Sequence, residues 1–208
     1  MCGIAAAFSF AKDLYNAPLS GFINSLQHRG PDGKGEFKSH QCWLGHTRLS
    51  IIGLGETGAQ PMTRRCKKDL KLTITFNGEI YNYIEVREKL KSLGHEFDGS
   101  SDTEVALRAY AEWGNCFEEK LNGIWAMAIF DHNNNELFLT RDRFGVKPLY
   151  IYARKSKIYF ASELKAFRHL PGEDQIKIDQ SFIKLLGKRS HGKEFILQKG
   201  ISRFSAGH

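Results

Sequence analysis

The second residue of the chain is a cysteine, and only Met1 precedes it. If Met1 is cut away, the Cys2 thiol shares one residue with a free chain-terminal amine. A thiolate is a strong nucleophile, and an α-amine titrates near neutral pH, so the amine can serve as the base that takes the thiol proton. The bland alternative is a small apolar residue opening a buried strand, because residues 3–8 are glycine, alanine, isoleucine and phenylalanine. A lone cysteine favours that alternative.

Three further segments place charged or amide side chains beside expected strand ends and glycines, which is typical of a binding site. They are residues 45–51, 76–83 and 101–104. The dipeptide Asn77-Gly78 is also a hairpin-turn signal. Asp102 would lie in the first turn of a helix, where a carboxylate is stabilising without any ligand. Because Ser101 already supplies the cap there, we favour a ligand-binding role for Asp102.

The length of 208 residues and the 41% hydrophobic content predict one domain with one sizeable core. No run of apolar residues is long enough to span a membrane, and the N-terminus lacks the pattern of a signal peptide, so we expect a cytoplasmic protein that does not enter a membrane. The four cysteines show no CxxC pair and the histidines no metal-ligand spacing. We therefore expect neither disulfides nor a metal.

The formal charge of +7 is concentrated near the C-terminus, where residues 181–208 hold six basic side chains and one acidic one. A second basic cluster, at residues 64–68, is interpreted as a solvated loop. Neither cluster is interleaved with aromatic side chains for base stacking, so we expect no nucleic-acid partner. Residues 186–208 form a basic tail that is expected to be a mobile segment or a docking surface.

The order of elements predicts antiparallel sheets covered by helices. Apolar spacing predicts a short helix at 19–27, and residues 42–52 and 72–76 are typical of strands. Two helices with capping boxes are expected at 82–93 and 101–113, each followed by glycine. Residues 124–130 are apolar on both faces and predict a strand covered on both sides, and 136–140, 149–152 and 157–161 are expected to continue it as a meander. Two sheets packed face to face with helices outside fit this order.

Several of these segments, in this order, resemble the N-terminal glutaminase domain of glutamine-hydrolysing asparagine synthetases. The resemblance extends to about residue 167. It rests on Cys2-Gly3-Ile4, His28-Arg29-Gly30-Pro31-Asp32-Gly33, Gly45-His46-Thr47-Arg48-Leu49-Ser50-Ile51, Gly58-Ala59-Gln60-Pro61-Met62, Phe76-Asn77-Gly78-Glu79-Ile80-Tyr81-Asn82-Tyr83, Ser101-Asp102-Thr103-Glu104, Arg141-Asp142-Arg143-Phe144-Gly145-Val146-Lys147-Pro148-Leu149-Tyr150 and Phe160-Ala161-Ser162-Glu163-Leu164-Lys165. So many ordered motifs reverse the preference for the bland interpretation of Cys2.

The resemblance implies an N-terminal-nucleophile hydrolase fold, an α+β sandwich of four layers in the order αββα. It also implies a catalytic Cys2, with an oxyanion hole made by the Asn77 side-chain amide and the Gly78 backbone N–H. A glycine there would let the backbone approach the tetrahedral intermediate closely.

The remaining roles concern the glutamine substrate. Arg48 would hold its α-carboxylate, and Asp102 its α-ammonium with Glu79 as a neighbour. Leu49 and Ile51 would line the pocket mainly through backbone groups. His28 and His46 would be hydrogen-bonded scaffold, because the terminal amine removes the need for another base, and the loop at 141–148 would be structural.

The implied reaction is thiolate attack on the side-chain amide of L-glutamine, loss of ammonia and hydrolysis of the γ-glutamyl thioester. No metal or organic cofactor takes part in this domain, and ATP and magnesium belong to a separate synthetase domain. The pyrophosphatase-type loop of such a domain does not occur in these 208 residues. The chain is therefore expected to be either a shortened piece or a lone glutaminase, partnered by an ATP-dependent synthetase domain or subunit, and a homo-oligomer is left open.

Two alternatives to this assignment remain. Within enzymes, the domain could belong to another class II amidotransferase that feeds sugar, phosphoribosylamine or antibiotic amidation. The stretches His46-Thr47-Arg48-Leu49-Ser50-Ile51 and Lys147-Pro148-Leu149-Tyr150 favour the asparagine synthetase type. From a different class, the chain could be a catalytically silent module that senses glutamine or docks a partner. Retention of Met1 would favour that interpretation, because Cys2 would then have no free amine.

Overall fold

The structure is a computed structural model that describes residues 1–53, 55–174, 176 and 200–207. Its strands are β1 Gly3–Ser9, β2 Gly33–Lys38, β3 Cys42–Arg48, β4 Met62–Arg65, β5 Lys71–Ile80, β6 Gly123–Asp131, β7 Glu136–Arg141, β8 Tyr150–Arg154, β9 Lys157–Ala161 and β10 Ile201–Arg203. Its α-helices are α1 Ser20–Asn24, α2 Tyr83–Ser92 and α3 Asp102–Trp113. Its 3₁₀ helices are η1 Gln27–Arg29, η2 Glu56–Gly58, η3 Lys67–Asp69, η4 Gly114–Lys120, η5 Leu164–His169 and η6 Gly172–Asp174.

The described strands form two antiparallel sheets. One has six strands in the order β10-β8-β9-β1-β3-β2, and the other has four in the order β4-β5-β6-β7. Strand β1 therefore lies inside its sheet, between β9 and β3, with Ala5 opposite both Ala161 and Gly45. All residues of β1 are buried, so Cys2 directly precedes a central, buried strand.

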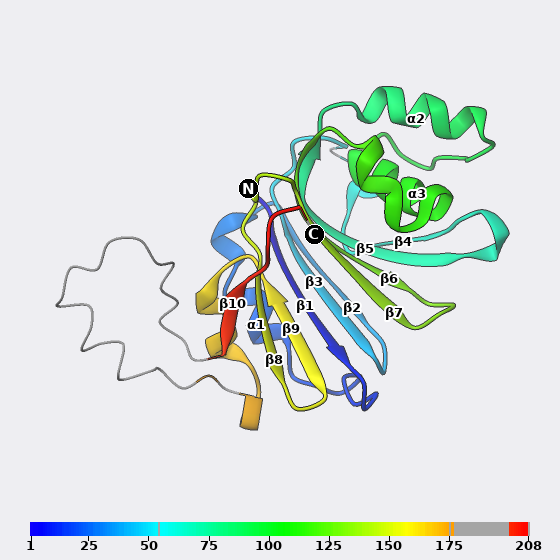
Figure 1. The fold of residues 1–208 in the computed structure, drawn as a ribbon. Helices are drawn as coiled ribbons and strands as arrows, with labels where there is room; N and C mark the ends of the chain where they lie inside the picture. The colour runs from blue at the N-terminus through cyan, green and yellow to red at the C-terminus, as the bar shows by residue number, and fades with distance from the viewer. Residues whose placement is uncertain (54, 175, 177–199, 208) are drawn as a thin grey trace.

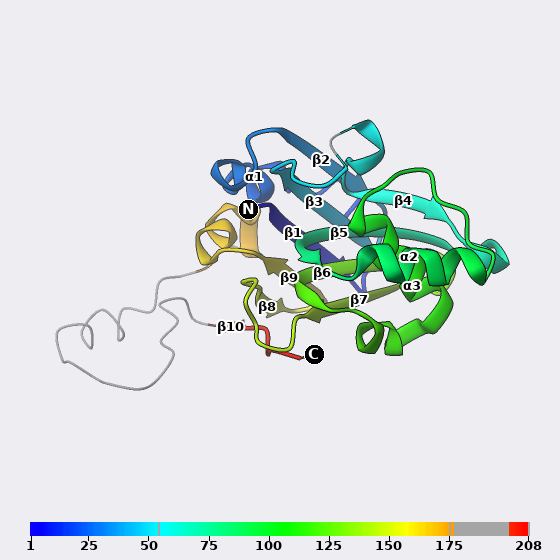
Figure 2. The same cartoon turned by 90° about the horizontal axis from the view of Figure 1, so that it is seen from above.

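Three hydrophobic cores separate four layers, which confirms the expected αββα sandwich. Between the sheets lie side chains from both, including Leu44 and Phe130. The outer face of the four-stranded sheet packs against α2 and α3, and that of the six-stranded sheet against α1 and η5. Figure 1 shows α2 and α3 beside the four-stranded sheet, and Figure 2, from above, shows α1 on the opposite side of the two sheets.

The helices differ from the sequence expectations in the length of α1 and in the caps of α2 and α3. Helix α1 covers only Ser20–Asn24 of the expected 19–27, because the chain tightens into η1 afterwards. The capping box expected at Asn82 is wrong: its side chain makes no cap bond with α2 and instead bonds the Lys120 carbonyl and the Asn122 N–H. At α3 half of the expected box forms, since Ser101 accepts from Glu104 N–H.

The strands differ mainly in where they end. Strand β3 stops at Arg48, four residues before the expected end, whereas β5 continues through Asn77 to Ile80. The turn that the isolated dipeptide Asn77-Gly78 would favour does not form, because Asn77 is opposite Ala126 and Gly78 opposite Trp125. The buried strand expected at 124–130 is confirmed by β6.

Three other segments were not expected in these positions. The basic cluster at 64–68 is not a loop throughout, because Arg64 and Arg65 belong to β4, which pairs with β5. The expected meander is interrupted: β7 pairs with β6, whereas β8 and β9 join the other sheet. Of the basic tail at 186–208, residues 186–199 and 208 lie outside the described residues, whereas Ile201–Arg203 form β10, which pairs with β8.

None of the helices in the described part of the chain combines the length and the apolar composition that crossing a membrane requires.

Candidate active site

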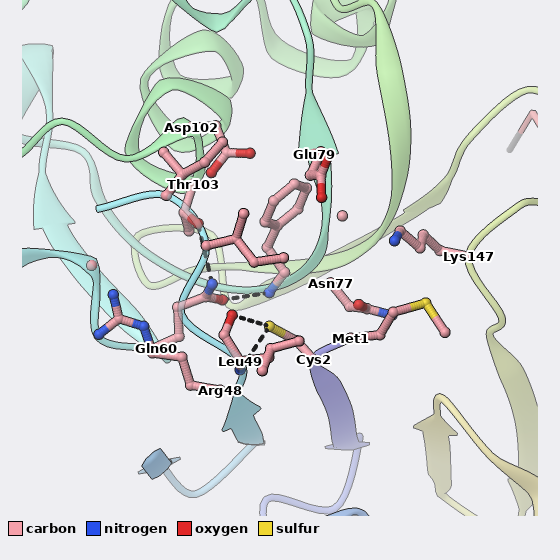
Figure 3. A pocket seen from close by; sticks show the side chains of 15 residues that line it. Met1, Cys2, Arg48, Leu49, Gln60, Asn77, Glu79, Asp102, Thr103 and Lys147 are labelled. Carbon is pink, nitrogen blue, oxygen red and sulfur yellow. Dashed lines mark hydrogen bonds between the residues drawn. The ribbon is translucent and has the colours of Figure 1, made fainter. Parts of the chain in front are cut away.

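One pocket beside the start of β1 gathers side chains and backbone from six separate chain segments. It contains all eight residues that the sequence assigned to a site, so residues far apart in the chain meet as expected. The lining residues are Met1, Cys2, Arg48, Leu49, Ile51, Ile52, Gly58, Gln60, Phe76, Asn77, Gly78, Glu79, Asp102, Thr103 and Lys147 (Figure 3).

The Cys2 sulfur lies at the end of β3 and contacts its backbone. The Leu49 N–H donates to Sγ at 3.4 Å, and the thiol faces the Leu49 carbonyl oxygen at 3.6 Å. Burial raises the pKa of the Cys2 thiol, while the Leu49 hydrogen bond and the cations of the N-terminus, Lys147 and Arg48 lower it. Burial prevails, so the thiol depends on these neighbours and on a base to form a nucleophile.

The backbone around Cys2 is held by close packing and by an arginine. Arg29 Nε donates to the Cys2 carbonyl at 2.9 Å, and its NH1 is paired with Glu163 at 2.9 Å. A Cβ on Gly3 would come within 2.6 Å of Thr47 Oγ1, so a glycine is needed here. These contacts fix the direction in which the thiol projects.

Asn77 is buried at 1% exposure in β5, and its side-chain Nδ2 has no hydrogen-bond partner among the described residues. An unpaired buried amide donor is costly, by about 1–3 kcal/mol, unless a ligand pairs with it. Figure 3 shows this side chain facing the pocket near Cys2. The Nδ2 donor is therefore available to a negatively charged oxygen on a group that becomes bonded to the Cys2 sulfur.

The structure adds a second reason for a glycine at position 78. A Cβ here would lie 2.3 Å from the Ile124 carbonyl oxygen and 2.8 Å from Trp125 Cα on the paired strand β6. The close approach of these two strands therefore requires a glycine whether or not the Gly78 N–H contacts a reaction intermediate.

Asp102 lies at the N-terminus of α3 with one carboxylate oxygen accepting from Ile80 N–H at 3.1 Å. Its burial raises the carboxyl pKa to about 6, against the backbone hydrogen bonds that lower it, and the nearby Glu79 raises it further. Two acidic side chains thus share the upper part of the pocket in Figure 3. Such a pair is suited to binding an ammonium group, because a nearby positive charge would favour the carboxylate forms of both Asp102 and Glu79.

Arg48, Leu49 and Ile51 form the opposite rim. The Arg48 guanidinium donates to the Gly53 carbonyl and, at 3.2 Å, to the Gly55 carbonyl. A guanidinium has five N–H donors, so two carbonyls do not exhaust it. Leu49 offers its backbone to the sulfur, whereas Ile51 is 59% exposed at the mouth of the pocket.

The whole chain, residues 1–208, matches the family described as the glutamine amidotransferase domain. The chain belongs to this family. The expected resemblance is thereby confirmed, and the catalytic roles of individual residues remain proposals.

Curated relatives are glutamine-hydrolysing asparagine synthetases. Asparagine synthetase 3 of Bacillus subtilis is 40% identical over 80% of this chain and 27% of its own length. A putative asparagine synthetase of Methanocaldococcus jannaschii is 38% identical over 79% of this chain and 34% of its own. The chain thus spans about a third or less of these relatives.

Solved amidotransferases share the fold. The glutamine phosphoribosylpyrophosphate amidotransferase of B. subtilis, complexed with ADP and GMP, superimposes with a TM-score of 0.69 at 23% identity, covering 81% of this chain and 43% of that one. An allosteric regulatory enzyme of purine biosynthesis gives a TM-score of 0.66 at 24% identity, covering 80% and 43%. This likeness confirms the expected N-terminal-nucleophile hydrolase fold.

In this amidotransferase domain, sequence reasoning missed Gln60, Thr103 and Lys147. Gln60 accepts from Phe76 N–H at 2.6 Å and donates to Thr103 Oγ1 at 3.1 Å, so it connects β5 to the start of α3 beside Asp102. Gln60 and Thr103 belong to the motifs of the resemblance, but no signal in the sequence shows that they meet. Lys147 comes from the loop that was expected to be structural only.

The two histidines lie where the scaffold interpretation placed them. His46 on β3 donates from Nε2 to the Phe76 carbonyl on β5 at 3.2 Å, so this bond joins the two sheets. Burial lowers the pKa of His46 to about 3. It is therefore neutral near pH 7 and does not line the pocket. His28 faces Glu163 at 3.0 Å on the surface.

Proposed function

We propose that this chain hydrolyses the side-chain amide of L-glutamine to glutamate and ammonia through a thioester on Cys2. The observation that carries the proposal is the unpartnered Nδ2 of Asn77, a buried donor in the same pocket as a cysteine thiol. A donor of this kind is favourable where a negative oxygen develops during acyl transfer. Membership of the glutamine amidotransferase domain family supports the choice of substrate.

The first half of the reaction begins after Met1 has been removed. In the structure Met1 precedes Cys2, so the Cys2 nitrogen is an amide and cannot act as a base. Once free, the amine takes the thiol proton and the sulfur attacks the amide carbon of glutamine. The carbonyl electrons move onto oxygen, which the Asn77 side-chain amide and the Gly78 N–H stabilise. Return of those electrons to the carbon breaks its bond to the amide nitrogen. That nitrogen receives the proton held by the Cys2 ammonium and leaves as ammonia.

The second half releases glutamate. The amine, neutral again, takes a proton from water as the water attacks the thioester carbon. The same donors stabilise the second oxyanion. Collapse of this intermediate expels the sulfur, which recovers a proton, and the γ-carboxylate of glutamate is formed. The number of protons and electrons is unchanged, so the domain itself needs no redox or metal cofactor for these steps.

Recognition of the amino acid uses the two ends of the pocket. Arg48 pairs with the α-carboxylate, for which a guanidinium fork has matching geometry. Asp102, with Glu79 beside it, pairs with the α-ammonium. Leu49 and Ile51 contact the substrate mainly through their backbone groups.

The ammonia is consumed by an amidation of the asparagine synthetase type, in the cytoplasm where ATP is available to the synthetase partner. The support for this step is the similarity to asparagine synthetases, of which the chain spans only a fraction. ATP and magnesium act in that partner rather than in this domain. Without the partner, hydrolysis proceeds slowly, and the ammonia escapes into solvent.

The test compares the parent with Cys2→Ala and measures glutamate and ammonia. The parent releases both in equal amounts, without any effect of ATP or aspartate, and Cys2→Ala loses several orders of magnitude in rate. Cys116→Ala, which removes an exposed thiol elsewhere, retains the parent rate. A Cys2→Ala variant that kept a tenth of the activity would contradict the proposal. Intact mass of the parent shows whether Met1 is removed; if Met1 stays and glutamine is bound but not hydrolysed, the silent sensing module is the better assignment.

A further inference from the structure

Lys147 is a mostly buried cation in the pocket of the proposed glutaminase. The residue as a whole is 7% exposed, and no hydrogen bond or ion pair of its ammonium is found among the described residues. Its nitrogen is not among the buried side-chain nitrogens that lack a partner, so it stays in contact with the open space of the pocket. The charge is therefore directed into the pocket and is not neutralised by another side chain.

The backbone of the loop that carries Lys147 is fixed by one buried carboxylate. Asp142 accepts from the backbone N–H groups of Phe144 at 3.1 Å, Val146 at 2.9 Å and Lys147 at 3.1 Å. Arg141 Nε donates to the Lys147 carbonyl at 2.6 Å. Both sides of the Lys147 backbone are thus held, and its side chain enters the pocket with the nitrogen foremost, on the side of Glu79 and Asn77 (Figure 3).

The charged groups that surround the Cys2 sulfur come from every element packed on the pocket. They are the terminal amine, Arg48 at the end of β3, Glu79 on β5, Asp102 at the start of α3 and Lys147. Arg29, which is paired with Glu163, contacts only the Cys2 carbonyl. The cations that lower the pKa of the thiol are the terminal amine, Lys147 and Arg48.

Two of these three cations are not available to the sulfur during the proposed reaction. The terminal amine of the structure belongs to Met1, and the Cys2 amine that replaces it after removal of Met1 must be neutral to act as a base. Arg48 is neutralised by the α-carboxylate once glutamine is bound, and its guanidinium already donates to Gly53 and Gly55. Lys147 then provides the remaining positive charge for the sulfur.

We propose that Lys147 is a positioning residue that acts through Cys2, its ammonium in the shared pocket favouring the thiolate over the thiol at the reacting end. This inference rests on the proposed glutaminase function, but it concerns the state of the thiol and can be measured without turnover. Lys147 forms and breaks no covalent bond. It supplies positive charge near the sulfur while the thiol proton passes to the Cys2 amine.

The experiment follows the pH dependence of Cys2 alkylation by iodoacetamide, a neutral reagent that a cation does not attract. Peptide mass analysis separates Cys2 from Cys116, the exposed thiol that serves as an internal reference in the same sample. In Lys147→Met the midpoint pH for Cys2 rises by about one unit, so alkylation at neutral pH slows roughly tenfold. The midpoint for Cys116 stays where it is, and Lys147→Arg restores the parent midpoint for Cys2.

Lys89→Met, which removes an exposed lysine of α2, is the matched control and shifts neither midpoint. Thermal unfolding of Lys147→Met checks that the fold is kept, since the backbone hydrogen bonds of this residue do not involve its side chain. An unchanged Cys2 midpoint in folded Lys147→Met overturns the inference, and so does a shift that Lys147→Arg fails to reverse. The proposed function fails separately, if the parent releases no glutamate or Cys2→Ala still does.

Discussion

The backbone N–H of Leu49 donates a hydrogen bond to the sulfur of Cys2 at 3.4 Å. This contact joins Cys2, the residue before the central strand β1, to Leu49, the residue after β3. Leu49 directly follows Arg48 in the chain. The proposed nucleophile and the proposed anchor for the α-carboxylate are therefore positioned by the same strand end. Any change that moves the end of β3 should alter substrate binding and thiol reactivity together.

Asn77→Ala is expected to lower kcat by about a hundredfold to a thousandfold and to leave KM for glutamine nearly unchanged. The amide donor would be used by the oxyanion and not by the ground-state substrate, and loss of one such donor costs about 3 kcal/mol. Steady-state glutamate release gives both constants. Because Nδ2 has no partner among the described residues, the free energy of unfolding should fall little. A loss of stability as large as the loss of transition-state stabilisation would show that Asn77 is structural.

If Asp102 binds the α-ammonium as proposed, glutamine binding should depend on pH. Its pKa is raised to about 6, so the carboxylate that an ammonium requires is lost as the pH falls below that value. In a Cys2→Ala background, which prevents turnover, the Kd for glutamine at pH 5 should be roughly tenfold weaker than at pH 7. Calorimetry measures it. Adding Asp102→Asn should weaken binding and make it independent of pH; a parallel pH profile in that variant would remove Asp102 from ammonium recognition.

The same carboxyl also makes stability depend on pH. Burial raises the pKa of Asp102 from its ordinary value of 3.8 to about 6 in the fold, so between these two pH values the folded state binds more protons than the unfolded state. The free energy of unfolding therefore falls as the pH rises from about 4 to about 6, and this group contributes about 2 kcal/mol to the decrease. Urea unfolding of the parent and of Asp102→Asn at both ends of this range isolates the contribution. A parent whose stability relative to Asp102→Asn rises with pH would contradict the sign.

Gly78→Ala should destabilise the fold by about 1–3 kcal/mol, because the new Cβ would meet the backbone of β6 at 2.3 Å. Denaturant unfolding measures the loss. Gly33→Ala, on strand β2, is the matched control, since its Cβ would have its nearest neighbour at the ordinary distance of 3.8 Å. Equal stability of the two variants would mean that β5 and β6 can separate without cost at this position.

Sequence reasoning could predict the layers and the membership of the site because these depend on patterns within single segments. The apolar run of β6 predicts a strand buried on both faces, and the motifs around Cys2, Arg48, Asn77 and Asp102 identify residues that line one pocket. Each of these signals is local, so it survives without knowledge of the tertiary contacts.

Local composition is misleading where distant segments come into contact. The dipeptide Asn77-Gly78 alone has the composition of a turn, and pairing with β6 keeps it extended. Asn82 has the composition of a helix cap, but the chain at 120–122 offers it two backbone partners. In both places tertiary hydrogen bonds prevailed over local preference. That Lys147 lines the same pocket as Cys2 depends on the packing of the whole domain, which its loop sequence does not show.

The most direct test of the account is the mass of the protein after rapid acid quenching during turnover with glutamine. The account predicts that Met1 is absent and that a γ-glutamyl group, labile to hydroxylamine as a thioester is, resides on the peptide that begins with Cys2. Asn77→Ala should form it more slowly, and Cys2→Ala should not form it. Glutamate production with the adduct on another residue, or by protein that retains Met1, would contradict the central claim.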